Sequence, residues 1–581
     1  MLYWKAKSAA IVNHLKKMSI RKIATVTMAA LIGLMAPIAT VADIYADDKA
    51  GSANTQTEQP AQPPSGQQNG QPPNGAPPAG DPPSGAPQGQ PPSGSGSGAD
   101  TQAYDYNGAL SASKTADGKA VTIENETISS TEADKNVALA ENGGTLTISG
   151  STLNKSGDSQ NADNTNFYGT NASVLAVGEK SQVYIDSSGI TSTSEGSNGI
   201  FATDNASVFA NNVAITTRDS NSARGLDATY GGTIIANNMT ISTEGDHSAT
   251  LATDRGGGNL SVTNSTLSTK GSGSPLLYST GNIQVDNVTG TASGSQIAGM
   301  EGKNRILISR STLDSTNDNK SGSDPVKNGV ILYQSTSGDA DTSTDEAAFF
   351  QAVDSTLKTS ITDGAMFYVT NTEANVVLSG TTLDFDSQKV NLISAVTNDN
   401  NWGQSGSNGG KLTFTGIGES LSGGVQVDKA SSVSLYLLSG STWDGALAKG
   451  STAKNLTVNV DADSTWTLTE DTTVGTLNAA KGAKVVDQEG KTVSIVQDGK
   501  TLVEGDSDVT LTVSKYTTKV KTSDSNKVST DTIDRTDFDQ YYKTTTAYGN
   551  NSGSSGADLG STSGGESILD RISNWLKGVF A

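Results

Sequence analysis

Recurrent aspartates are the residues best placed to carry out chemistry in this chain. Asp204 and Asp254 end two equivalent short strands, two repeats apart. Asp227 lies between them, and Arg255 directly follows Asp254. Two carboxylates about 5–10 Å apart can cleave a glycosidic bond, and strands two layers apart in a stack are separated by about that distance. Asp204, Asp227, Asp254 and Arg255 are therefore the catalytic candidates if the protein is an enzyme.

Other common catalytic side chains are scarce. The chain has no cysteine, and His247 is the one histidine beyond residue 42. A histidine-dependent nucleophilic relay would need this residue, and a histidine-rich zinc site is excluded. The lack of cysteine also excludes a disulfide framework. We expect His247 to be an exposed loop residue.

A nine-residue pattern, apolar-x-apolar-x-x-x-x-apolar, recurs about every 25 residues and must position these candidates. Its first position holds Val121, Leu146, Val183, Val208, Ile234, Leu260, Ile306, Phe350 and Val376. A weaker copy begins at Ile283 and has Gly290 in its last place. A constant period of this length indicates stacked units that cannot bury their apolar faces alone.

Each repeat contains three short strands separated by corners, as in residues 234–236, 239–243 and 249–254. Apolar residues two positions apart point to the same side of a strand. One corner position holds an asparagine in four successive repeats, at Asn212, Asn238, Asn264 and Asn287. The pattern predicts an all-β fold, a parallel β-helix solenoid with an asparagine ladder.

This repeat resembles the right-handed parallel β-helix of the pectin-lyase-like superfamily. Residues 440–443 (Gly-Ser-Thr-Trp) and 463–477 resemble the C-terminal passenger region of bacterial autotransporter adhesins, although we expect no membrane barrel to follow. The first resemblance implies a polysaccharide lyase or hydrolase, and the second implies adhesion. The enzyme motifs of that superfamily are not reproduced; Ala202-Thr203-Asp204 only echoes its Asn-Thr-Asp.

The third strand of each repeat offers a possible binding face. One row of apolar residues alternates with a second apolar row, and a pleated strand can turn only one of them inward. An exposed apolar row would suit sugar rings or a protein partner; the alternative is that bulges or covering loops bury both. The ligand-binding candidates are Phe201, Leu251, Leu277, Ile331 and Phe367.

Two insertions interrupt the repeats, at residues 314–328 and 337–348. Variable loops on a rigid stack are common sites of binding. The second insertion is acidic, and Asp339, Asp341, Asp345 and Glu346 are candidate ligands for Ca²⁺. We expect no other cofactor.

The remaining segments differ in composition. Residues 1–42 have a basic start, an apolar run and small residues at the end, which predicts a secretory signal peptide; the alternative is an uncleaved anchor. Twelve of the fifteen prolines lie between residues 60 and 92. We predict a proline-rich linker (43–103), the β-helix (104–484), a β cap (485–520), a polar and Gly/Ser-rich linker (521–565) and an amphipathic helix (566–581).

The predicted terminal helix has its apolar residues at helical spacing on one face. It is too short to cross a bilayer, so we expect it to touch a membrane surface or a partner, the alternative being a helix that packs back on the solenoid. Its apolar residues are Ile568, Leu569, Ile572, Trp575, Leu576, Val579 and Phe580.

The acidic balance limits the partners. Without residues 1–42 the chain has 33 Lys and Arg against 60 Asp and Glu, which repels nucleic acid. We predict a secreted or cell-surface, adhesin-like bacterial protein that binds polysaccharide or a surface component without catalysis. The alternatives are a polysaccharide lyase or glycoside hydrolase, and a structural component of the envelope or matrix.

Overall fold

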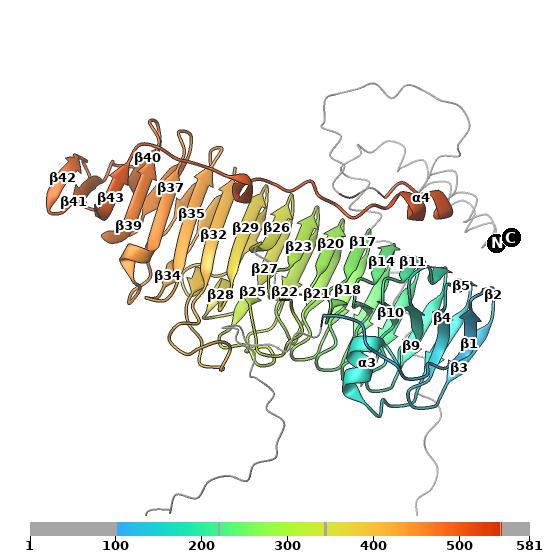
Figure 1. Ribbon diagram of the computed structural model, residues 1–581. Coiled ribbons are helices and arrows are strands. Elements are labelled where there is room, and N and C mark those ends of the chain that lie inside the picture. Colours follow the sequence, from blue (N-terminus) through green and yellow to red (C-terminus); the bar gives the residue numbers. More distant parts are fainter. Residues whose placement is uncertain (1–101, 219–220, 342–345, 547, 549–581) are drawn as a thin grey trace, which may run out of the picture. The chain divides into compact units, whose positions relative to one another are not determined.

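The structure, a computed structural model, describes residues 102–218, 221–341, 346–546 and 548. Successive strands turn from one sheet to the next, and in the regular coils the strands pair in parallel with their counterparts in the neighbouring coil (Figure 1). The chain is therefore an all-β, parallel β-helix solenoid, as the 25-residue period predicts.

The strands form four sheets, which we call A, B, C and D. Sheet A contains β1 (Ala112–Asp117), β4 (Asn136–Glu141), β7 (Val174–Val177), β10 (Ile200–Thr203), β13 (Leu226–Ala228), β16 (Leu251–Thr253), β19 (Leu277–Ser279), β22 (Ala298–Glu301), β25 (Asn328–Tyr333), β28 (Ala365–Thr370), β31 (Asn391–Ala395) and β34 (Val425–Val427). Sheet B contains β2 (Ala120–Glu124), β5 (Thr145–Ser149), β8 (Gln182–Asp186), β11 (Ser207–Asn211), β14 (Thr233–Asn237), β17 (Asn259–Thr263), β20 (Asn282–Asp286), β23 (Arg305–Ser309), β26 (Ala348–Val353), β29 (Glu373–Ser379), β32 (Lys411–Ile417), β35 (Ser432–Leu438), β37 (Leu456–Val460), β39 (Thr472–Ala479), β41 (Ser494–Gln497), β42 (Lys500–Val503) and β43 (Thr510–Thr517). Sheet C contains β3 (Thr127–Ser130), β6 (Thr152–Lys155), β9 (Gly189–Ser192), β12 (Ala214–Thr217), β15 (Thr240–Thr243), β18 (Thr266–Thr269), β21 (Thr289–Ala292), β24 (Thr312–Ser315), β27 (Thr356–Thr359) and β30 (Thr382–Asp384). Sheet D contains β33 (Ser420–Ser422), β36 (Thr442–Asp444), β38 (Thr465–Leu468) and β40 (Lys484–Asp487).

The repeated apolar residues form the interior of the coils. The first two positions of the pattern lie in sheet B and the third in sheet C, and Val208, Ile234 and Leu260 are directly paired across three strands. Gly290 leaves room that its neighbours fill, because a Cβ atom there would lie 2.7 Å from Leu276 and 3.0 Å from Leu313. The weaker copy of the repeat is thus completed by side chains of the adjacent strands.

The asparagine ladder is confirmed. Asn212, Asn238, Asn264 and Asn287 all have φ between 52° and 55°, a left-handed conformation that asparagine tolerates better than most residues. The side-chain amide of Asn238 donates to Asn212 at 2.6 Å, and that of Asn287 donates to Asn264 at 2.6 Å. These residues hold the corners between sheets B and C.

Past β40, which ends at Asp487, the regular coils give way to mixed pairing. β41 and β42 form an antiparallel hairpin, and β43 pairs in parallel with both β39 and β41. Just before this region, Trp443 and Trp466 stack inside adjacent coils with ring centroids 5.0 Å apart. The repeated tryptophan is therefore an interior residue.

A segment after β43 runs back along the outer face of sheet B. We call residues 523–546 the strap; it contains the 3₁₀ helix η2 (Asp524–Asn526) and the helix α4 (Thr536–Tyr542). Figure 1 shows it passing from β32 and β29 towards β11. The composition of this stretch predicts a polar linker, whereas in the structure its polar groups bind the sheet.

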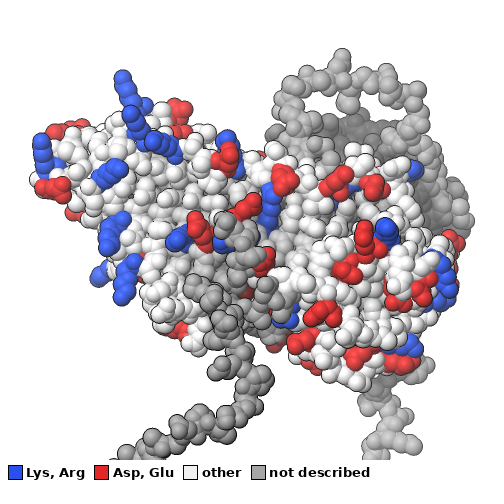
Figure 2. All heavy atoms as spheres, viewed as in Figure 1, with Lys and Arg blue, Asp and Glu red and all other residues white. Residues whose placement is uncertain are grey.

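Charges are unevenly distributed on the face drawn in Figure 2. Lys and Arg gather over the end that β39 to β43 form, and Asp and Glu are more frequent over the opposite end, around β1 to β20.

Candidate functional site

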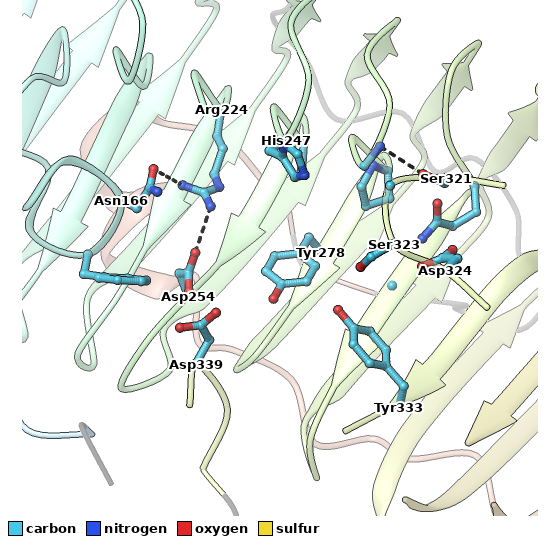
Figure 3. Close-up of a pocket in the computed structure, with 17 residues that line it drawn as sticks. Asn166, Arg224, His247, Asp254, Tyr278, Ser321, Ser323, Asp324, Tyr333 and Asp339 are labelled. Carbon is cyan, nitrogen blue, oxygen red and sulfur yellow. Dashed lines mark hydrogen bonds and ion pairs between the residues drawn. The ribbon is translucent and has the colours of Figure 1, made fainter. Parts of the chain in front are cut away.

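A cavity of about 220 Å³ lies against the outer face of sheet A (Figure 3). The outward-facing position of β19 holds Tyr278, and the register pairs it with Ala252 of β16 and Gly299 of β22. Ala252 has only a methyl group and Gly299 has no side chain, so the row is hollow on both sides of Tyr278. The hollow is smaller than the roughly 300–1,000 Å³ of pockets for drug-sized ligands.

Three segments complete the walls of the cavity. The helix α3 (Ala162–Tyr168) contributes Asn166 and Phe167, and the two insertions contribute residues 321–324 and Asp339. Asn161 caps α3 by accepting a hydrogen bond from the backbone of Asn164, which fixes the start of the helix. Both insertions that the sequence analysis singled out therefore border this one cavity.

Arg224 links two buried aspartates at one side of the cavity. Its Nη2 donates to Asp254 at 2.9 Å, and its Nη1 forms an ion pair with Asp227 at 3.3 Å. Nη1 also donates to Asn166 of α3 at 3.2 Å. Burial raises the pKa of Asp227 to about 7 although Arg224 opposes the shift, and it raises the pKa of Asp254 well above the ordinary value. One guanidinium therefore only partly offsets the cost of burying two carboxyl groups.

Arg255 is held in a second ion pair. Its Nη2 donates to Asp339 at 2.9 Å, and its guanidinium lies 3.6 Å from the centroid of the Phe167 ring. Gln102 joins the same region by donating to the Gly338 carbonyl and accepting from the Gly256 amide. The segment before β1 thus fastens the second insertion to the coil.

Tyrosine side chains line the opposite wall. Tyr278 donates to the buried Glu301 at 3.0 Å, and Glu301 also accepts hydrogen bonds from Ser335 and Ser337. Tyr333 of β25 lies on the same wall as Tyr278, and the hydroxyl groups of both point into the same space (Figure 3). Burial raises the pKa of both phenols and that of Glu301, so the tyrosines are neutral donors at pH 7.

Asp324 of the first insertion lines the cavity beyond the tyrosines. Asn328 donates to its Oδ2 at 2.8 Å, and among the described residues no ion pair reaches it. Burial raises its pKa to about 7, with the Asn328 hydrogen bond opposing the shift. A carboxyl group in this state can hold a proton near neutral pH.

The structure brings together only part of the predicted catalytic set. Asp227 and Asp254 meet through Arg224, and Arg255 lies next to them. Asp204 lies in a different hollow, with Tyr104 and Glu141, at a turn where its φ is 50°. The three aspartates therefore do not converge in one groove.

The predicted apolar binding row spans two faces of sheet A. Leu251, Leu277 and Phe367 point into the coil interior, whereas Phe201 and Ile331 point outward. All five side chains have 0% exposure. The residues before β1 and after α3 cover Phe201, and Trp402 covers Ile331. These residues form no exposed stripe.

The predicted Ca²⁺ ligands all lie in the second insertion. Asp339 is bound to Arg255, and Asp345 lies outside the described residues. No group of three or more His, Asp or Glu side chains that could hold a metal ion occurs in the described part of the chain. His247 is exposed at the rim of the cavity. Residues 1–101 and 549–581, with the predicted signal peptide, proline-rich linker and amphipathic helix, also lie outside the described residues.

Sequence reasoning missed the tyrosines and acids of the cavity, Tyr278, Glu301, Asp324 and Tyr333. The sequence does contain a signal for part of this set. It is the residue that follows the inward-pointing leucine in the sheet A strand of a repeat. That position holds Asp227 after Leu226 and Tyr278 after Leu277, and the register shows that it faces outward. A polar residue there marks the outer face of sheet A.

No family model, curated protein or solved structure matches the chain. Within the described ranges, no helix is long and apolar enough to cross a membrane.

Proposed function

We propose that this protein is a secreted or cell-surface, adhesin-like protein that binds glycans in the cavity on sheet A and does not cleave them. The predicted signal peptide and proline-rich linker support the location. The cavity supports the binding role.

The observation that carries the proposal is the combination of aromatic and polar groups in a small cavity. Tyr278 and Tyr333 offer ring faces and hydroxyl groups, and Asn166 and Gln296 add side-chain amides. Binding sites for small ligands combine such apolar surfaces with a few fixed polar groups. The volume of about 220 Å³ suits one sugar unit or the end of a chain better than an extended segment.

Glycoside hydrolysis is the second candidate, and Asp324 favours it. A carboxyl group with a pKa of about 7 can act as a general acid. The reaction also needs a free carboxylate as its partner, and Asp254 is engaged by Arg224. Elimination in the manner of a lyase would need a free basic residue, and both Arg224 and Arg255 are paired. Binding without cleavage therefore agrees better with the geometry.

The test is a retention assay of the full chain on immobilised polysaccharides, with released sugars measured in the same samples. A cavity-filling substitution links binding to the site. A Cβ atom at Gly299 would meet its neighbours at 3.5 Å or more, so Gly299→Ala should fold and bind normally. Gly299→Leu should fill the hollow and reduce retention at least tenfold.

Retention without product, lost in Gly299→Leu, supports the proposal. Released reducing ends that disappear in Asp324→Asn would replace it with hydrolysis. Retention that is equal in Gly299→Leu and Gly299→Ala would place binding elsewhere, and no retention at all would favour a structural role.

A further inference from the structure

Acidic groups outnumber basic ones around the cavity. Asp254, Asp324 and Asp339 line it, and Asp227 and Glu301 lie directly behind the lining through Arg224 and Tyr278. The only Lys or Arg side chains that the described residues bring to this cluster are the guanidinium groups of Arg224 and Arg255. Among the described residues, the charged and titratable groups at the cavity are Arg224, Asp227, His247, Asp254, Arg255, Tyr278, Glu301, Asp324, Tyr333 and Asp339.

Neither guanidinium is free to receive an anionic ligand. Arg224 divides its donors among Asn166, Asp227 and Asp254. Arg255 donates to Asp339 and is stacked on the Phe167 ring. A uronic acid would therefore add a carboxylate to a cluster in which acidic side chains already outnumber basic ones. Its binding would carry a high electrostatic free-energy cost, because the site is partly desolvated.

A cationic ligand would meet the opposite situation. Asp324 has one neutral donor, Asn328, and no ion-pair partner among the described residues. Tyr333 lies in the same part of the cavity and Tyr278 lies further along it, and aromatic rings attract cations as well as the apolar faces of sugars. Burial raises the pKa of Asp254 and Glu301 as well as that of Asp324. A positive charge bound next to Asp324 would favour the ionised form of that carboxyl group.

We infer that the cavity selects a sugar that carries a protonated amine, such as a hexosamine without its N-acetyl group, and rejects uronic acids. This inference rests on the glycan-binding function proposed above. The ammonium group of the sugar binds the carboxyl group of Asp324 in the first insertion. The sugar ring packs on Tyr278 or Tyr333.

The experiment is calorimetric titration of the full chain at pH 6 with three tetrasaccharides: β-1,4-linked glucosamine, its N-acetylated counterpart and α-1,4-linked galacturonate. Glucosamine should bind at least tenfold more tightly than the N-acetylated tetramer, and galacturonate should bind the least. Asp324→Asn should remove most of this preference without abolishing binding of the N-acetylated tetramer. Asp384→Asn, at an exposed carboxylate of β30 in sheet C, is the matched control and should leave the preference unchanged.

A non-specific attraction to the acidic surface needs its own control. Tetralysine carries similar charge without a sugar ring, and its binding should be weak and insensitive to Gly299→Leu. Equal affinity for tetralysine and the glucosamine tetramer would overturn the inference.

The other outcomes separate the inference from the proposed function. Equal or tighter binding of the N-acetylated tetramer, lost in Gly299→Leu, would overturn the amine preference and keep glycan binding. Preferential binding of galacturonate would do the same and would revive the lyase alternative. Binding of none of the three would overturn both proposals.

Discussion

Burial raises the pKa of Asp324 to about 7 from an ordinary value of 3.8, so the folded protein holds this proton more tightly than the unfolded chain does. A carboxyl group of this kind stabilises the fold fully only below about pH 4, and the stabilisation is lost as the pH rises to about 7. Asn328 can still donate to the side-chain oxygen of an asparagine at this position. Asp324→Asn should therefore raise the free energy of unfolding relative to the unaltered protein at pH 8. This difference should exceed the difference at pH 4 by on the order of 2 kcal/mol.

Melting temperatures of the two proteins at pH 4, 6 and 8 measure this difference. It should grow between pH 4 and 7 and then level off. Asp384→Asn, at an exposed position, should show no comparable trend. A difference that is the same at all three pH values would contradict the assigned role of burial.

At the scale of single elements, the strap follows the outward-facing row of sheet B strand by strand. Asn526 donates to Thr415 of β32 at 2.9 Å, and the Ser529 amide donates to Gln351 of β26 at 2.7 Å. Further along, Arg535 donates to the Ser261 carbonyl of β17 at 2.7 Å. The strap's polar groups thus replace water on a sheet face that would otherwise be solvated.

The strap ends in an apolar anchor. Phe538 of α4 is fully buried and packs with Phe209 and Ile235 of sheet B. Tyr542 donates to the Phe209 carbonyl at 2.7 Å. Phe538→Ala should weaken this attachment by about 3–5 kcal/mol, because it removes a large side chain from a site with 0% exposure.

The expected result is local release of the strap. Limited proteolysis should cut Phe538→Ala within residues 520–548 at least tenfold faster than the unaltered protein. Gln540→Ala, an exposed change on the same helix, should be cut at the unaltered rate. Unchanged cleavage in Phe538→Ala would show that the anchor does not hold the strap.

The same elements show what the sequence can and cannot predict. Spacing alone identified the inner residues of sheets B and C, because a buried row must be apolar in every coil. It could not assign the rows of sheet A, because covering segments bury both. A shift of one residue moves a side chain to the other face, so Leu277, which points inward, was grouped with Ile331, which points outward under Trp402. The strap lacks any apolar period, since much of it binds the sheet through polar atoms such as those of Asn526, Ser529 and Arg535.

On the scale of the whole molecule, the strap connects coils that have no direct contact with each other. Neighbouring coils of a solenoid stabilise only one another, so a long stack can unfold in parts. The strap spans from β32 to β8, where Tyr542 also donates to the Ile185 carbonyl at 3.1 Å. We expect it to make the stack unfold as one unit.

A variant that combines Arg535→Ala, Phe538→Ala and Tyr542→Ala tests this coupling. Trp402, Trp443 and Trp466 all lie from β31 onward, so in a Trp4→Phe and Trp575→Phe background fluorescence reports the C-terminal coils, whereas circular dichroism reports every coil. With the strap intact, the two urea transitions should coincide. In the triple variant, the coils around Phe209 and Ile235 lose their cover and should unfold at a lower urea concentration, so that dichroism changes before fluorescence. If both signals shifted together, contacts between neighbouring coils would be sufficient for cooperativity, and the strap would only add stability.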